Sequence, residues 1–209
     1  MNILEALKSN HDNFKSKVDV PQTYTGILES EGYTFCTLCD LFKIERILES
    51  GTGEGRSTKI FSQYFDDVTI ETIDRVDNLN IPNVIKHVGN GITLLPKLLN
   101  RSKNKTAVFI DGPKGQVAID LAVRCLKEDH VSFVGIHDTH KLSYAKVNKT
   151  REVLDGLKIL KYYSDECLHL DCEDQEAGGW KPYHKMRDNV WEYIGSYGPT
   201  ICFLFKEYP

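Results

Sequence analysis

Acidic side chains follow two apolar runs in the second half of the chain, where a catalytic site could form. Asp111 comes directly after residues 106–110, and Asp138 comes shortly after residues 131–136. Both runs are typical of buried parallel strands, whose carboxyl ends meet at the sheet edge where ligands bind. Two carboxylates held close together repel each other, so a functional pair predicts a bound divalent cation or one raised carboxyl pKa. Helix capping or loop polarity is the alternative explanation.

Four side chains in these two segments are candidate catalytic bases: Lys114, His137, Asp138 and His140. A histidine titrates near neutral pH without any shift, whereas Lys114 could act only if burial beside a cation lowered its pKa. Surface hydrogen bonding is the alternative role for the two histidines.

A glycine-rich loop in the first half of the chain predicts a ligand site. Residues 44–48 are mostly apolar, and glycine then occupies three alternate positions, Gly51, Gly53 and Gly55, before a helix expected from residue 57. Glycine permits positive φ and leaves main-chain atoms open to a ligand. Strand, tight turn and helix are therefore predicted, and a turn without any ligand is the alternative.

Acidic residues within this loop indicate the charge of the ligand. Glu49 and Glu54 would repel the pyrophosphate of a dinucleotide, which needs donors at a helix N-terminus. A ligand with positive charge is expected instead. Asp74 ends the next predicted strand, at the offset typical of an acid that binds ribose hydroxyls. Glu71 is a rival for that role, but three residues earlier it should point to the opposite face of the strand.

The composition is that of a single globular domain. The chain has 209 residues, 41% of them hydrophobic and 27% charged, with a formal net charge of -4. This charge does not favour a nucleic-acid partner, and no apolar run is long enough for a membrane span, so we expect a cytoplasmic protein without either partner. Six cysteines are present, and Cys36 and Cys39 lie on an apolar helix face rather than in a convincing zinc motif.

The predicted elements alternate between strand and helix, which favours an open, mostly parallel, doubly wound α/β sheet. Residues 1–43 form a helical N-terminal segment, with residues 24–42 read as two pieces interrupted at Gly32. Residues 44–140 form the cofactor-binding core. Residues 164–200 form a long aromatic insertion, expected to be a lid or acceptor wall, or a contact in a homo-oligomer, with neither favoured.

Two motifs resemble those of class I methyltransferases, which bind S-adenosylmethionine. The loop at residues 49–55 is similar to their E-x-G-x-G-x-G loop. Asp111, Lys114 and Asp138 resemble the acids and the lysine of small-molecule O-methyltransferases of the catechol-type and antibiotic- or sugar-modifying groups. This resemblance implies a seven-stranded sheet with an antiparallel last strand.

The resemblance also implies roles for individual residues. The cofactor contacts would come from the following positions: Glu49, Gly51, Thr52, Gly53, Gly55, Asp74, Asn90, Gly91 and Asp111. Asp111 and Asp138 would hold a divalent metal, most simply Mg²⁺. Thr139 departs from the catechol group, which has an amide ligand there.

The predicted function is therefore transfer of a methyl group from S-adenosylmethionine to a hydroxyl of a small-molecule acceptor. A nicotinamide-dependent oxidoreductase and a non-catalytic binding or structural protein with the same fold are the alternatives.

Overall fold

The computed structural model describes residues 3–21, 26–77, 79–139, 150–164, 181–187, 190–197 and 200–207. Within these ranges the helices are α1 (Ile3–Lys17), α2 (Glu29–Phe42), α3 (Arg56–Tyr64), α4 (Gly91–Leu99), α5 (Gln116–Leu126) and α6 (Thr150–Gly156). The strands are β1 (Arg46–Ser50), β2 (Thr69–Asp74), β3 (Val84–Val88), β4 (Thr106–Ile110), β5 (Val131–Ile136), β6 (Leu160–Tyr163), β7 (Lys181–Arg187), β8 (Val190–Tyr197) and β9 (Cys202–Phe205).

Seven strands form one sheet in the order β3-β2-β1-β4-β5-β9-β6. Strands β1 to β5 pair in parallel, and β9 runs antiparallel between β5 and β6. The predicted doubly wound sheet with an antiparallel last strand is confirmed. Because β1, β4 and β5 lie side by side, the loops that follow them meet at one edge of the sheet.

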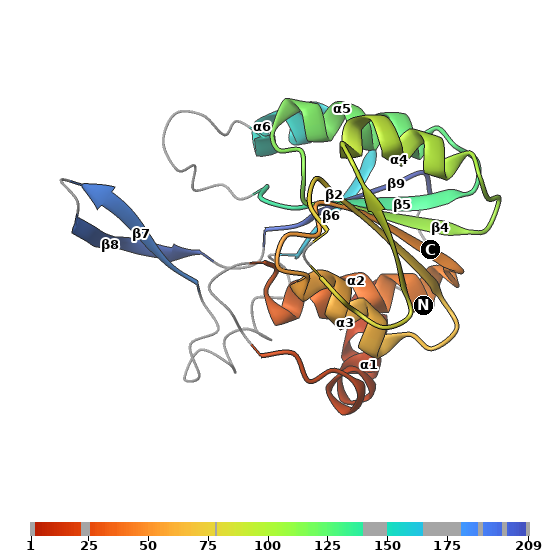
Figure 1. The fold of residues 1–209 in the computed structure, drawn as a ribbon, viewed down its shortest axis with the longest axis horizontal. Coiled ribbons are helices and arrows are strands. Elements are labelled where there is room, and N and C mark those ends of the chain that lie inside the picture. Colours follow the sequence, from red (N-terminus) through yellow and green to blue (C-terminus); the bar gives the residue numbers. More distant parts are fainter. Residues whose placement is uncertain are drawn as a thin grey trace.

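The predicted insertion contributes a separate two-stranded sheet. Strands β7 and β8 pair with each other in antiparallel fashion and lie apart from the main sheet (Figure 1). The rest of residues 164–200 falls almost entirely outside the described residues, so the role of the insertion as a lid or as a contact between copies stays a prediction.

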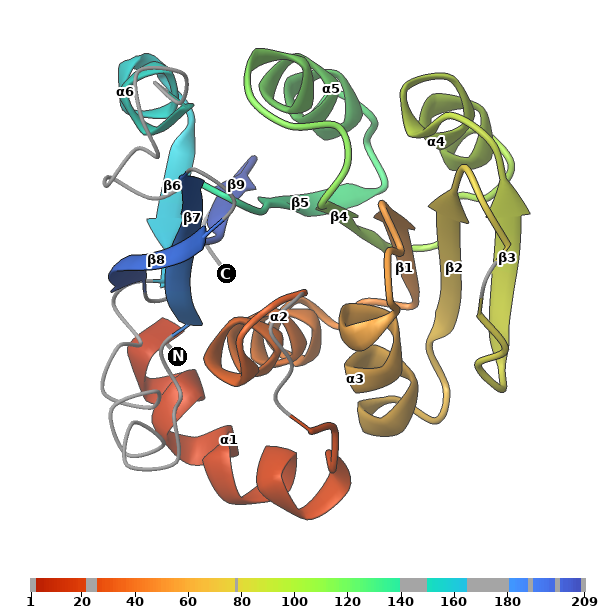
Figure 2. The ribbon, with the colours of Figure 1, turned by 60° about the vertical axis from the view of Figure 1, so that its left-hand side comes forward.

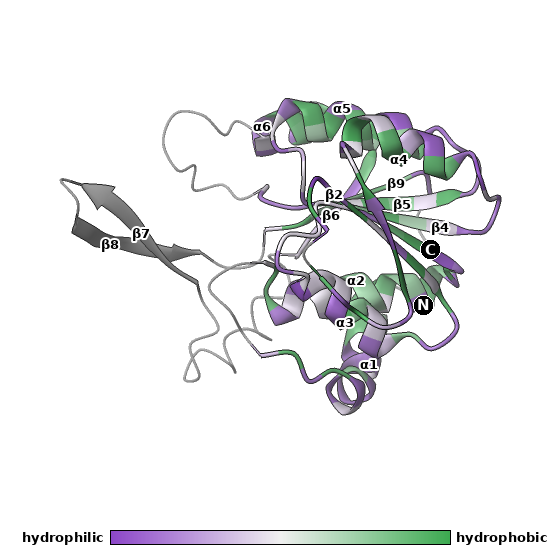
Figure 3. Cartoon of the chain, in the orientation of Figure 1, coloured by the Kyte–Doolittle hydropathy of each residue, from purple (hydrophilic) through white to green (hydrophobic). Residues whose placement is uncertain are grey.

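Helices cover both faces of the main sheet. Helices α1, α2 and α3 lie on one face, and α4, α5 and α6 lie on the other (Figure 2). Each face has its own core of buried side chains. Hydrophobic and hydrophilic residues alternate along α4 and α5 (Figure 3), as expected of helices that bury only one face against a sheet.

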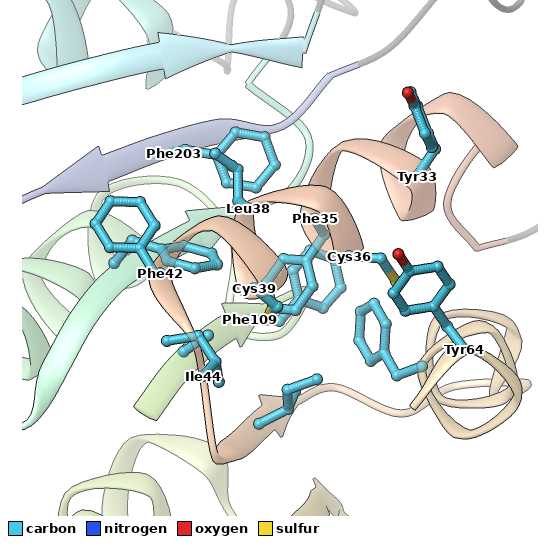
Figure 4. Packing of buried hydrophobic residues seen from close by; sticks show 14 of the residues in the cluster. Tyr33, Phe35, Cys36, Leu38, Cys39, Phe42, Ile44, Tyr64, Phe109 and Phe203 are labelled. Atoms are coloured by element: carbon cyan, nitrogen blue, oxygen red, sulfur yellow. The ribbon is translucent and has the colours of Figure 1, made fainter. Parts of the chain in front are cut away.

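Helix α2 is the most deeply buried helix of the first face. Its Phe35 stacks on Phe61 of α3, with ring centroids 4.6 Å apart, and meets Phe109 of β4 edge-on at 5.4 Å (Figure 4). The prediction that Gly32 interrupts the helix is wrong. A Cβ atom on Gly32 would lie 2.9 Å from Cδ1 of Ile60, so glycine here permits close packing of α2 on α3.

The cysteines of α2 belong to this core. Cys36 and Cys39 are buried, and burial raises the pKa of both thiols well above the usual range. The predicted apolar helix face is confirmed, and a thiolate zinc site is disfavoured at this pair. Of the helices that the structure describes, none has both the length and the apolar character that a membrane span requires.

Candidate active site

The glycine-rich loop joins β1 to α3 and packs against the end of β4. Gly51, Gly53 and Gly55 have φ angles of 96°, 54° and 76°, in the region that favours glycine. A Cβ atom on Gly51 would lie 2.5 Å from the amide nitrogen of Gly112, whereas one on Gly53 would meet nothing within 4 Å. The predicted strand, turn and helix are confirmed, and Gly53 is the glycine that leaves open space beside the loop.

Glu49 lies beneath this loop rather than in it. Its side chain is fully buried, and the carboxylate accepts hydrogen bonds from Ser57, from Oγ1 of Thr58 at 2.5 Å and from Oγ1 of Thr72 at 2.7 Å. Burial raises the pKa of Glu49, and the three hydroxyl donors offset part of that rise. Our expectation that this carboxylate would meet the ligand is therefore revised, because its described contacts connect β1 with α3 and β2.

Asp74 lies at the end of β2, directly beside the loop. Its Oδ2 atom accepts a hydrogen bond from the amide of Gly53 at 2.8 Å. Glu71 is engaged elsewhere, since it accepts from Nε of Arg46 at 2.6 Å and lies 2.7 Å from Nε2 of His87. Asp74 rather than Glu71 is thus the carboxylate that the structure brings to the loop.

Asn90 and Gly91 lie at the start of α4. Asn90 caps this helix, because its side-chain oxygen accepts a hydrogen bond from the amide of Ile92 at 2.9 Å. Gly91 packs closely against the Ser50 hydroxyl at the end of β1. Both residues therefore have structural tasks at the sheet edge, and their predicted contact with adenine stays a prediction.

A pocket of about 380 Å³ opens beside the loop. The residues that line it come from four separate segments: Gly26, Thr52, Gly53, Glu54, Arg56, Ser57, Asp74, Val76 and Asp111. Four of our predicted cofactor-binding residues thus surround one pocket, namely Thr52, Gly53, Asp74 and Asp111.

The charge of this pocket is set by three carboxylates in its wall, those of Glu54, Asp74 and Asp111. The guanidinium of Arg56 is directed away from them, to main-chain carbonyls of residues 20, 21 and 27. The pocket therefore suits a ligand with positive charge.

A second group of side chains gathers at the ends of β4 and β5. The Nζ atom of Lys114 contacts Asp111 and lies 2.6 Å from Oδ2 of Asp138. The Nδ1 atom of His137 lies 2.6 Å from Oδ1 of Asp111 and 3.6 Å from Oδ1 of Asp138. Asp111 belongs to this cluster and to the pocket wall, so the cluster adjoins the ligand pocket.

The cluster keeps its two basic groups protonated. Burial by itself lowers the pKa of His137, but the carboxylates of Asp111 and Glu31 outweigh this effect and raise it to about 10. Burial likewise opposes the charge on Lys114, yet Asp111 and Asp138 raise the pKa of its ammonium. In this arrangement neither side chain is a free base at neutral pH.

The pKa values of the two carboxyl groups shift in the opposite direction, downward. Burial favours their protonation, but His137 and Lys114 overcome it and lower the pKa of both Asp111 and Asp138. The alternative that one of this pair would have a raised pKa is therefore wrong. Positive side chains, rather than a shared proton, relieve the repulsion between the carboxylates.

Sequence reasoning missed Glu31 as a member of this site. Glu31 lies in the first turn of α2, is 1% exposed, and places Oε2 3.4 Å from Nε2 of His137. Its carboxylate also accepts from the amide of Leu28 at 2.5 Å and from the amide of Thr200 at 2.5 Å. The only sequence signal for Glu31 was an acidic residue within a mostly apolar helix. The sequence does not reveal which strand end that residue contacts.

Thr139, which departs from the catechol pattern, faces another segment. Its amide and its Oγ1 atom donate to the carbonyl of Thr200, at 2.8 and 2.6 Å. This buried side chain thereby directs its hydroxyl to the segment that precedes β9. His140, a predicted candidate base, lies outside the described residues.

The donor atoms of the cluster fit a divalent cation. Asp111, His137 and Asp138 each offer one ligand atom, and these three atoms lie within 4.8 Å of one another. Carboxylate oxygen and imidazole nitrogen are both common metal ligands. The predicted pair of carboxylates is therefore joined by a nitrogen donor that we had considered only as a base.

The strand order and the position of this site define a class I methyltransferase fold. Comparisons with protein-family models and with curated proteins find no match. Among solved structures, the chain is similar to the O-methyltransferase from Bacillus cereus in complex with SAH, at 13% identity over 98% of this chain and 90% of that chain, with a TM-score of 0.53. It is also similar to cofactor-bound Rv0187 from MTB, at 12% identity, 97% and 90% coverage and a TM-score of 0.52. At these identities the likeness establishes the fold.

Proposed function

We propose that this protein transfers a methyl group from S-adenosylmethionine to a hydroxyl group of a small molecule. One observation carries the proposal: Asp111 is shared between the pocket beside the glycine-rich loop and the cluster of Lys114, His137 and Asp138. A cofactor bound in this pocket would lie next to groups that could bind an acceptor. The SAH-bound O-methyltransferase with the same fold supports this reading by analogy.

The charge of the pocket suits this cofactor. S-adenosylmethionine carries a sulfonium and an ammonium group, which the carboxylates of Glu54, Asp74 and Asp111 would attract. Asp74 would also accept from the ribose hydroxyls, while its bond to the amide of Gly53 holds it beside the loop. Gly53 itself lacks a side chain where the ligand would lie.

The cluster would prepare the acceptor. In-line displacement at the methyl carbon depends mainly on positioning, together with removal of the hydroxyl proton. A divalent ion held by Asp111, His137 and Asp138 would supply charge stabilisation for the developing alkoxide. Lys114 would have to leave the place between the two carboxylates, and outside it the carboxylates would no longer raise its pKa. The charge of the nearby ion would lower the pKa of Lys114, and only after its ammonium had lost a proton to solvent would the neutral amine accept the hydroxyl proton.

The alternatives fit less well. The pyrophosphate of a nicotinamide cofactor would face Glu54, Asp74 and Asp111 in the pocket wall, which disfavours an oxidoreductase. A non-catalytic protein would have no need for ionised groups gathered beside a ligand pocket.

Calorimetric titration of the purified protein with S-adenosylmethionine and with NAD tests this proposal. We expect binding of S-adenosylmethionine alone, followed by transfer of labelled methyl groups to a small-molecule panel that contains hydroxylated and matched deoxy compounds. Binding of NAD without S-adenosylmethionine would contradict the proposal, and so would labelling of the deoxy compounds equal to that of the hydroxylated ones.

A further inference from the structure

We infer that the ion of this site is a first-row transition ion such as Mn²⁺ rather than Mg²⁺, bound through His137 as well as the two aspartates, and that Glu31 is a positioning residue that orients His137. The inference rests on the proposed function, because it specifies the metal of the same cluster.

The donor set is the first reason. Thr139, at the position of the amide ligand of the catechol group, is 1% exposed and directs its hydroxyl to the carbonyl of Thr200 at 2.6 Å. The third donor atom beside the two carboxylates is a nitrogen, because Nδ1 of His137 lies 2.6 Å from Asp111 and 3.6 Å from Asp138. Imidazole nitrogen binds first-row transition ions, and Mn²⁺ is the member of that series that is also suited to carboxylate oxygen, which supplies the other two ligands here. Mg²⁺ prefers oxygen ligands alone, in near-ideal octahedral geometry.

The fixed position of the imidazole is the second reason. His137 is only 8% exposed and is held from two sides, with Nδ1 2.6 Å from Asp111 and Nε2 3.4 Å from Glu31. Metal-binding histidines commonly direct their other ring nitrogen to a carboxylate, which fixes the ring orientation. Glu31 has this relationship to His137.

Glu31 is itself anchored by the fold. The amides of Leu28 and Thr200 donate to its two oxygens at 2.5 Å, and Oγ1 of Thr200 adds a third bond at 3.0 Å. Three donors thus hold this carboxylate, one at the start of its own helix and two from Thr200 in a distant segment. The imidazole is therefore pre-oriented toward the aspartates before any ion arrives.

Lys114 differs from His137 in exposure. Its side chain is 47% exposed, while that of His137 is 8% exposed. The ammonium can therefore swing into solvent without unpacking the core and leave its place between the carboxylates to another cation. His137 would remain as the nitrogen ligand, and its Nδ1 proton would pass to solvent when the ion binds, because an imidazole must be neutral to bind a metal.

Direct metal binding to the full-length protein tests the inference without relying on turnover. We expect Mn²⁺ to bind at least tenfold more tightly than Mg²⁺ in calorimetric titrations. The electron spin echo of bound Mn²⁺ should show modulation from a directly coordinated ¹⁴N nucleus. Equal or tighter binding of Mg²⁺, or an echo without nitrogen coupling, would overturn the inference and leave methyl transfer standing.

Variants separate positioning from folding. Glu31→Gln keeps the size and one acceptor oxygen, and we expect it to weaken Mn²⁺ binding about tenfold, the lower end for such partners, with Mg²⁺ affinity changed less than twofold. Glu71→Gln is the matched control, since Glu71 lies 2.7 Å from His87 in a separate, part-buried pair. It should leave Mn²⁺ affinity unchanged. Equal losses for both ions in Glu31→Gln would reduce Glu31 to a structural role and contradict the assignment.

Two further outcomes distinguish this inference from the proposed function. A protein that binds S-adenosylmethionine and turns over but binds no divalent ion would overturn the metal site alone. A protein that binds Mn²⁺ with nitrogen coupling but not S-adenosylmethionine would support the metal inference and overturn the proposed methyl transfer.

Discussion

The ammonium of Lys114 lies 2.6 Å from Oδ2 of Asp138 and also contacts Asp111, so one side chain bridges the two carboxylates. A divalent ion would need this same place. In the proposed metal site, Lys114 would therefore compete with the ion, and its side chain is 47% exposed.

Removal of this competitor should strengthen metal binding. Lys114→Met keeps the length of the side chain and removes the charge, so we expect Mn²⁺ affinity to rise about tenfold, equivalent to about 1.4 kcal/mol. Methyl transfer should nevertheless fall, because the proton acceptor is lost. Calorimetry and a methyl-transfer assay on the same sample measure both effects. Weaker metal binding in this variant would mean that Lys114 does not occupy the metal's place.

Metal removal should suppress turnover, and Asp138→Asn should prevent its recovery. Asp138 has a φ of 60°, which asparagine also tolerates, so the variant changes the charge with little backbone strain. We expect a chelator to abolish methyl transfer in the wild-type protein and added Mn²⁺ to restore it. In Asp138→Asn the rescue should fail while S-adenosylmethionine affinity stays within a few-fold. Full activity in chelator would exclude a catalytic metal.

Two glycines of the loop should respond differently to substitution. Gly53→Val should abolish S-adenosylmethionine binding, because its side chain would project into the open space beside the loop. Gly51→Ala should instead lower the midpoint of thermal unfolding, since its Cβ would lie 2.5 Å from the amide nitrogen of Gly112. Calorimetry and thermal melts of both variants compare the effects. Unchanged cofactor affinity in a folded Gly53→Val protein would remove the loop from the binding site.

Asp74→Ala should weaken cofactor binding by about 1 to 3 kcal/mol, the cost of leaving buried hydrogen-bonding groups unpaired. Asp74→Asn is the matched variant, because it retains an acceptor for the amide of Gly53 and should lose less. Titration calorimetry of the two variants gives the comparison. If both bind as tightly as the wild type, the ribose role belongs to another residue.

Glu49 should make folding stability depend on pH. Burial raises its pKa in the folded protein above the unfolded value of about 4.3. Such a group stabilises the fold fully below the unfolded pKa, and this contribution is lost as the pH rises through the folded pKa. Glu49→Gln removes the titration. We therefore expect the stability of the wild type relative to the variant to increase as the pH falls from 8 toward 5.

Urea unfolding of both proteins across that range measures the difference in free energy of unfolding. The test is whether this difference increases or decreases as the pH changes. A constant difference in stability between glutamate and glutamine at position 49 does not affect it. A difference that is independent of pH, or that shifts in favour of the variant at low pH, would contradict a raised pKa for Glu49.

Local sequence patterns determined the framework of this protein. Alternate glycines after an apolar run predicted the loop after β1, and apolar runs ending in acids predicted that Asp74, Asp111 and Asp138 lie at the same sheet edge. Strand and helix periodicity and glycine turns act over a few residues, so these features can be read from the chain.

Only the tertiary structure decided which partners the individual carboxylates and hydroxyls contact. Glu49 belongs to the loop motif, yet hydroxyls from α3 and β2 enclose it beneath the loop. Thr139 follows a predicted metal ligand, yet its hydroxyl donates to Thr200, which is 61 positions away. Glu31 meets His137 only because α2 packs under the end of β5. Such contacts depend on the packing of distant segments, and no local pattern encodes which buried carboxylate faces which partner.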